Sequence, residues 1–114
     1  MKIERNKNTK QSGTTEFLVY KEDSGYVGVC LTFDIVEEGS DPIELMKSIK
    51  EAAELHLETV MKNDLSDELL NRYAPNEYWE KYFEVARQIE NRPNSRSGFL
   101  TVSPYSSAMM PQFA

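Results

Sequence analysis

A helix start at residues 40–44 constrains the fold of this 114-residue chain more than any other feature. Asp41 can cap the free backbone N–H groups, Pro42 suits the first helical position, and Glu44 completes a capping box. The periodicity that follows predicts a helix to about Asn63, with an apolar face that must pack on another element and an opposite charged face. The apolar face comprises Leu45, Ile49, Ala52, Ala53, His56, Leu57 and Val60.

Two runs rich in aliphatic and aromatic residues precede this helix and predict a β-hairpin. Residues 16–22 and 26–33 are joined by a short Asp/Gly segment in which Gly25 can take a positive φ. The second run alternates between two faces. The bulky face is Val27, Val29, Leu31 and Phe33, and the mostly small face is Tyr26, Gly28, Cys30 and Thr32. We expect the bulky face to pack on a helix and the small face to allow another element a close approach.

A third, short strand is expected at residues 34–38, where acidic side chains suit an exposed sheet edge. Ser66 could cap a short helical segment, and a firmer helix is predicted from about Asn76 to Glu90. A last strand is expected at residues 98–103, ended by Pro104. The pattern as a whole predicts an α+β fold: an antiparallel sheet of three to four strands, a long amphipathic helix packed on one face, and a second C-terminal helix.

The second helix carries a wide aromatic face that has two interpretations. The face completes the core of the domain, or part of it binds another protein, because Tyr and Trp are enriched at interfaces. The candidate partner-binding residues are Tyr78, Trp79, Tyr82 and Phe83. The expected organisation is a flexible arm at residues 1–15, a domain with a helical C-terminal extension at 16–103, and a tail at 104–114.

The net charge of −6 bears on the choice of partner. A phosphate backbone repels an acidic field, so no direct binding of nucleic acid is expected, and a small basic protein is the favoured partner. The one basic cluster is Lys2, Arg5, Lys7 and Lys10. It is interpreted as a solvated tail, with a nucleic-acid-binding arm as the alternative.

Cysteine and hydropathy indicate where the protein works. Cys30 is the single cysteine and sits in an apolar run, which indicates a reduced, packed residue in a cytoplasmic protein. No stretch approaches the roughly 20 apolar residues of a membrane helix. The N-terminal charges have no apolar segment behind them, so neither a signal peptide nor a membrane partner is expected.

The chain offers few groups for catalysis. No phosphate loop, Cys-x-x-Cys pair or His-Glu-x-x-His motif is present, so no cofactor, metal or catalytic residue is expected. His56 is interpreted as a packed imidazole, with a general base as the alternative. The acids are interpreted as solvated surface, with a two-metal cluster as the alternative. The acids considered are Asp23, Asp34, Glu37, Glu38, Glu44 and Glu51.

An ordered series of short matches runs from residue 16 to residue 60. It consists of Phe17-Leu18-Val19-Tyr20, the acidic turn 22–26, the alternating strand 27–33, Glu38-Gly39-Ser40-Asp41, and the helix segment 51–58. This stretch resembles the HicB-like antitoxin domain, which has a partial ribonuclease-H-like fold. Two features differ from the family pattern: residues 32–35 replace a Leu-Pro-Gly-Cys turn, and residues 61–114 lack a basic recognition helix, so operator binding is not expected.

The resemblance implies a non-catalytic antitoxin that binds and occludes a small basic ribonuclease toxin of the HicA type, often as a homo-oligomer. Two alternatives stay open. One is a metal-dependent nuclease or other hydrolase on a ribonuclease-H-like scaffold, and the other is a self-associating accessory domain with no toxin partner.

Overall fold

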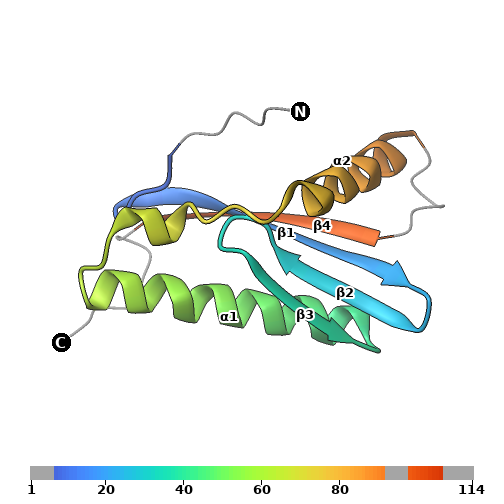
Figure 1. Cartoon of the computed structure of the whole chain (residues 1–114), viewed down its shortest axis with the longest axis horizontal. Coiled ribbons are helices and arrows are strands. Elements are labelled where there is room, and N and C mark those ends of the chain that lie inside the picture. The colour runs from blue at the N-terminus through green and yellow to red at the C-terminus, as the bar shows by residue number, and fades with distance from the viewer. Residues whose placement is uncertain (1–6, 92–97, 107–114) are drawn as a thin grey trace.

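The computed structural model describes residues 7–91 and 98–106. Within them the elements follow the order β1 (Ser12–Glu22), β2 (Gly25–Cys30), β3 (Ile35–Gly39), α1 (Pro42–Lys62), the 3-10 helix η1 (Asp67–Leu70), α2 (Asn76–Asn91) and β4 (Gly98–Ser106). The strands form one antiparallel sheet in the order β3-β2-β1-β4 (Figure 1). The predicted α+β class, the long helix and the second helix are therefore confirmed.

The two helices cover opposite faces of this sheet (Figure 1). Helix α1 contacts β1, β2 and β3 on one face, whereas α2 contacts β4 on the other. The buried side chains accordingly form two clusters, one between the sheet and α1 and one between the sheet and α2. The domain is thus a three-layer arrangement in which the sheet is the middle layer.

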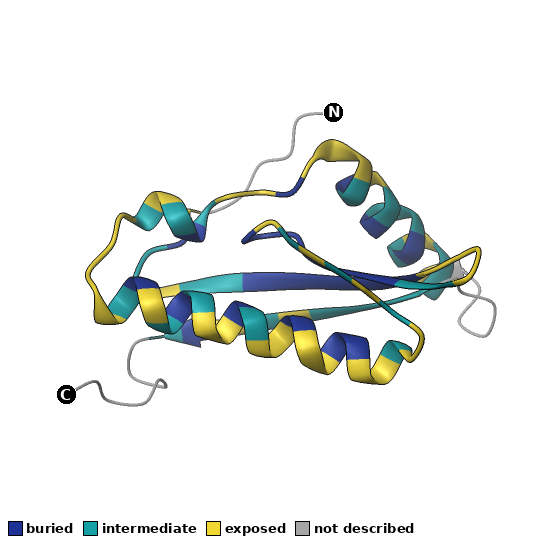
Figure 2. Ribbon diagram, turned by 60° about the horizontal axis from the view of Figure 1, so that its bottom comes forward, coloured by how far each residue is buried: buried dark blue, intermediate teal, exposed yellow. Residues whose placement is uncertain are grey.

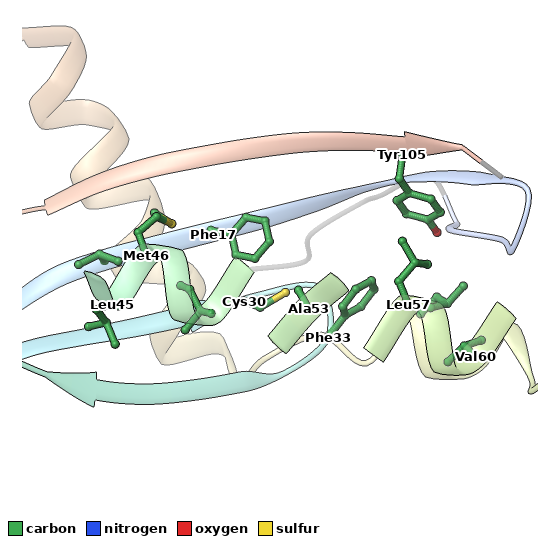
Figure 3. Close-up of a cluster of buried hydrophobic side chains, with 12 residues drawn as sticks. Phe17, Cys30, Phe33, Leu45, Met46, Ala53, Leu57, Val60 and Tyr105 are labelled. Atoms are coloured by element: carbon green, nitrogen blue, oxygen red, sulfur yellow. The ribbon is translucent and has the colours of Figure 1, made fainter. Parts of the chain in front are cut away.

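Helix α1 begins where the capping residues predict. The Asp41 Oδ1 atom accepts hydrogen bonds from the backbone N–H groups of Ile43 (2.9 Å) and Glu44 (3.3 Å), two donors that have no partner inside the helix. One stripe of the helix faces the sheet, and the other side is exposed (Figure 2). The buried stripe comprises Leu45, Met46, Ile49, Ala53, Leu57 and Val60, packed with Phe17, Cys30 and Tyr105 (Figure 3).

The small face of β2 is the face that α1 covers. A Cβ atom at Gly28 would lie 2.9 Å from Leu45 Cγ and 3.3 Å from two atoms of Ile49, so only a glycine lets the helix come this close. The bulky residues Val27, Val29 and Leu31 do pack on a helix, as expected, but that helix is α2.

Phe33 does not share the bulky face with which the sequence pattern groups it. Strand β2 ends at Cys30, and residues 31–34 form a turn. The alternation therefore stops before Phe33, whose ring joins the α1 cluster. Asp34 ends this turn at φ 57°, whereas the Gly25 backbone does not take the positive φ that the sequence allowed.

The chain is ordered earlier than residue 16, where the sequence pattern places the start of order. Strand β1 begins at Ser12, and Asn8 is buried. The Asn8 Nδ2 atom donates to the carbonyls of Thr14 and Leu70 (both 3.0 Å), and Oδ1 accepts from the Thr14 N–H (3.0 Å). A polar segment is held in place because both polar atoms of its buried amide are hydrogen-bonded, an effect that hydrophobic periodicity does not reveal.

Pro104 does not end the last strand, which continues to Ser106. The Glu16 N–H donates to Thr32 Oγ1, and the Glu16 carbonyl accepts from the Leu31 N–H, so the backbone of Glu16 points toward β2. Direction alternates along a strand, so the neighbours of Glu16 point toward β4. Thr15 pairs with Ser103, so the backbone groups of Ser103 point toward β1 and those of Pro104 point away from it. A missing N–H on that outer side removes no hydrogen bond from the sheet.

Candidate protein-binding surface

A hollow of about 840 Å³ lies between the first turns of α2, the β1–β2 hairpin and β3. It exists because the two helices cover the sheet unequally. Helix α1 covers β3 from one side. Among the described residues, β3 contributes none to the cluster under α2. Val36 of β3 is consequently 42% exposed on the α2 side of the sheet.

The strand register builds the floor of this hollow. The two-residue turn of the β1–β2 hairpin sets Tyr20 opposite Val27, and the β2–β3 pairing sets Val27 opposite Glu38. These three side chains form one cross-strand row on the α2 side. The first turns of α2 add Tyr78 and Lys81 to the wall.

Carboxylates dominate the rim of the hollow. Glu22, Asp23, Glu38 and Glu77 line it, and Lys81 is the one cation among its lining residues. Glu37 also lines the hollow, but its Oε1 atom accepts a 2.6 Å hydrogen bond from Ser48 on α1, so this carboxylate faces the other side of the sheet. Four acids against one lysine leave the hollow with a net negative charge.

The pKa of Tyr20 in the floor of the hollow is raised. Burial of the hydroxyl is the largest cause, electrostatic interactions with Glu22, Tyr78, Glu77 and Glu38 act in the same direction, and together they bring the pKa to about 12. The Lys81 Nζ atom lies 5.4 Å from the centre of the Tyr20 ring, within the range of a cation–π contact. The site therefore already accommodates a cationic group over an aromatic ring.

The four aromatic residues predicted to bind a partner have different positions in the structure. Trp79 (2% exposed) and Tyr82 (8% exposed) are core residues, with ring centres 5.7 Å apart. Phe83 is half-buried and packs on Tyr82 at 5.5 Å. Tyr78 is also half-buried but lines the hollow. The structure thus brings one of the four to the hollow and packs the other three in or against the core.

The acids considered for a metal cluster are dispersed. Asp23 and Glu38 lie at the hollow, Asp34 is exposed in the turn before β3, and Glu44 and Glu51 are exposed on α1. Within residues 7–91 and 98–106, no three His, Cys, Asp or Glu side chains lie close enough together to hold a metal ion.

His56 and Cys30 are both structural residues. The Nε2 atom of His56 donates to the Leu69 carbonyl at 2.6 Å, because a carbonyl oxygen can only accept, and the ring packs on Phe33 with centres 4.8 Å apart. The imidazole thereby holds η1 against α1. Cys30 is fully buried, and burial raises the pKa of its thiol to about 11, so it stays protonated and unreactive at neutral pH.

The N-terminal basic cluster is only partly within the described residues, since Lys2 and Arg5 lie outside them. Lys10 Nζ donates to the Leu65 carbonyl at 2.7 Å and lies 3.0 Å from Asp67 Oδ1. The hydrogen bond to Asp67 is the largest cause of the raised pKa of Lys10. This lysine anchors the start of β1 to the α1–η1 segment. None of the helices in the described part of the chain is long and apolar enough to cross a membrane.

The sequence pattern did not single out Tyr20, Glu22 or Glu77 as site residues. The predicted hairpin placed Tyr20 near the start of the second strand, but its pairing with Val27 depends on the two-residue turn that the structure shows. Periodicity does not predict where α2 lies on the sheet, and it is the position of α2 that leaves β3 uncovered on this face.

Comparison with known proteins identifies no relative. No family model matches the chain, and no significant match is found among curated proteins or solved structures. What the hollow binds is therefore inferred from its own geometry and charge.

Proposed function

We propose that this chain is a non-catalytic, HicB-like antitoxin that binds and neutralises a small basic ribonuclease toxin of the HicA type, and that the toxin docks at the acidic hollow. The observation that carries the proposal is the set of four rim carboxylates gathered beside an edge strand. The resemblance of residues 16–60 to the HicB-like domain supplies the identity of the partner.

Electrostatics support a basic partner. Each copy carries a net charge of −6, and at the hollow four rim carboxylates outnumber one lysine. Such a field speeds the encounter with a basic protein and disfavours acidic ones. The contribution of the field should weaken as salt is added, because the rim charges are exposed to solvent.

The make-up of the hollow also suits a protein ligand. Exposed Val36 and half-buried Tyr78 offer an apolar centre, and the carboxylates form a charged rim around it. An apolar centre inside a polar rim is the common plan of protein interfaces. Strand β3 lies at the end of the sheet, so its backbone can also add a strand or loop from the partner.

The test starts from the genes next to this chain's own gene: if one encodes a small basic protein, that protein is co-expressed with this chain. The wild-type chain should co-purify with that protein and suppress its cleavage of RNA. The variant Glu38→Lys/Glu77→Lys reverses two rim charges, and it should bind at least roughly tenfold more weakly, a difference of about 1.4 kcal/mol.

The matched control is Glu51→Lys/Glu54→Lys, which makes the same change in net charge on the exposed side of α1. This variant should bind nearly as well as wild type. Equal loss in both variants would mean that only net charge matters and would contradict docking at the hollow. A wild-type chain that neither binds nor inhibits a basic neighbour would contradict the antitoxin function itself.

A further inference from the structure

The two edges of the sheet differ in length and charge. The β3 edge is five residues long and carries Glu37 and Glu38, whose charge discourages pairing with a second copy of this acidic chain. The β4 edge is nine residues long, Gly98–Ser106, and contains no charged residue, although 28% of the chain is charged. A long, uncharged edge strand is a template for pairing with another strand.

We propose that β4 pairs antiparallel with β4 of a second copy of this chain, so that two sheets join edge to edge across a twofold axis. Within the described residues β4 pairs with β1 alone, and its other side is the end of the sheet. This inference is independent of the proposed toxin partner.

The direction of the backbone groups supports this pairing. The backbone N–H and C=O groups of Glu16 point toward β2. The backbone groups of its neighbours Thr15 and Phe17 therefore point toward β4, where these residues pair with Ser103 and Thr101. By alternation, the N–H and C=O groups of Gly98, Leu100 and Val102 point away from β1. The first half of β4 therefore presents an unbroken series of outward donors and acceptors.

Charge identifies the occupant as a second copy. Two copies with a net charge of −6 each repel, so they can meet closely only where the surface carries no acids. The exposed side of β4 provides such a surface, because the acid opposite Val102, Glu16, is buried. A strongly basic partner finds no opposite charge on β4. It is attracted instead to the acidic hollow beside β3, at the other end of the sheet.

Apolar burial favours the same contact. Val102 is 54% exposed, and it lies two residues from Leu100, which packs on the α2 cluster. Both side chains are on the α2 side of the sheet, because alternate residues share a face. Pairing of two β4 strands would extend this apolar row across the twofold axis and shield Val102 from water.

Pro104 sets the register. It faces outward but has no N–H, so pairing that includes it loses hydrogen bonds. Pairing centred on Leu100 avoids this loss, because Leu100 then faces Leu100 of the second copy, and Val102 faces Gly98 of the second copy. In this register every outward N–H from Gly98 to Val102 has an acceptor.

The test is sedimentation equilibrium of the full chain over a range of concentrations, with a monomer mass of 13.1 kDa. We expect wild type to form a reversible dimer. The variant Val102→Pro removes an outward N–H but none that bonds to β1, so it should fold and dimerise roughly tenfold or more weakly. The control Val102→Thr keeps the N–H and should dimerise much like wild type. Pro104→Val adds an outward donor, so it should dimerise at least as tightly.

Circular dichroism and thermal unfolding decide whether Val102→Pro is folded. If it is unfolded, Val102→Lys tests the same contact. It keeps every backbone group, lies opposite Glu16 of its own chain, and places a charge on the strand edge that discourages pairing. A wild-type chain that remains monomeric at all concentrations overturns the proposal. A folded Val102→Pro or Val102→Lys variant that dimerises as tightly as wild type also overturns it. So does an edge that pairs only with a different protein.

Discussion

The two faces of the sheet are covered in different ways. On the α1 face, a helix of 21 residues lies along three strands. It packs directly on the backbone of Gly28, because this residue has no side chain. On the α2 face, a 16-residue helix packs on the β1 and β4 side, and Val36 of β3 remains exposed. The first face is closed and apolar, whereas the second is half open and rimmed by acids.

This difference suggests a division of labour between the faces. A closed face contributes stability because it buries apolar surface without leaving a site to which a partner can bind. A half-open face keeps an anchored helix beside a hollow with exposed charged and aromatic groups, which is the arrangement that recognition requires. The following predictions test whether the faces differ in this way.

The largest effect is expected for Trp79→Ala. The indole is 2% exposed and contacts Tyr82, so its removal should lower the free energy of unfolding by about 3–5 kcal/mol. Urea unfolding measures this change. The matched variant Tyr78→Ala, at the hollow, should cost much less. If Trp79→Ala were as stable as Tyr78→Ala, Trp79 would be an interface residue and not part of the closed region of the α2 face.

A smaller loss is expected for Gly28→Val on the α1 face. The added side chain would overlap with Leu45 and Ile49, and overpacking of this kind costs about 1–3 kcal/mol. The control is Gly39→Ala, whose added Cβ would make ordinary contacts of 3.6–3.8 Å with Leu45. Equal denaturant midpoints for the two variants would show that α1 does not approach the sheet closely at Gly28.

Alkaline pH should weaken both faces through two buried tyrosines. The pKa of Tyr20 on the α2 face and that of Tyr105 on the α1 face are each raised to about 12, chiefly by burial. A tyrosine with a raised pKa contributes stability that is fully present below pH 10 and is lost as the pH rises through 12. Each should contribute on the order of 1 kcal/mol over that window.

Tyrosinate absorbance measures this titration as the sum over the six tyrosines of the chain. Tyr20→Phe and Tyr105→Phe should each remove one late-titrating group. If both variants left the high-pH end of the titration curve unchanged, the conclusion that these two hydroxyls are buried would be wrong.

The smallest effect is expected for Glu38→Gln/Glu77→Gln, which neutralises two rim carboxylates. Stability should change by no more than about 0.5 kcal/mol, because both groups are on the surface. The pKa of Tyr20 should nevertheless fall, because both carboxylates raise it. Glu51→Gln/Glu54→Gln serves as the control and should leave that pKa in place. An unchanged Tyr20 pKa in the rim variant would contradict a negative hollow.

Much of the fold could be predicted from the sequence because it is encoded locally. The Asp41 cap, the apolar stripe of α1 and the β1–β2 hairpin depend on residues close together in the chain. Which helix covers which face of the sheet was harder to predict, because it depends on the close approach of α1 to the sheet at Gly28.

Three features depend on contacts between distant parts of the chain, and periodicity does not report such contacts. Asn8 is held by Leu70, and this bond orders a segment that the sequence pattern assigns to a flexible arm. Strand β4 continues through Pro104 because of its outward position on an edge. The hollow needs the path of α2 as well as the strand register, so only Tyr78 of its lining was among the predicted partner-binding residues.

The most direct test of the central claim is amide hydrogen exchange of the wild-type chain with and without a small basic ribonuclease of the HicA type, the class of partner proposed above. We predict that binding slows exchange in the β1–β2 hairpin, β3 and the first turns of α2, while the exposed side of α1 is unaffected. Slowed exchange confined to α1, or no change in the hollow on complex formation, would contradict the account.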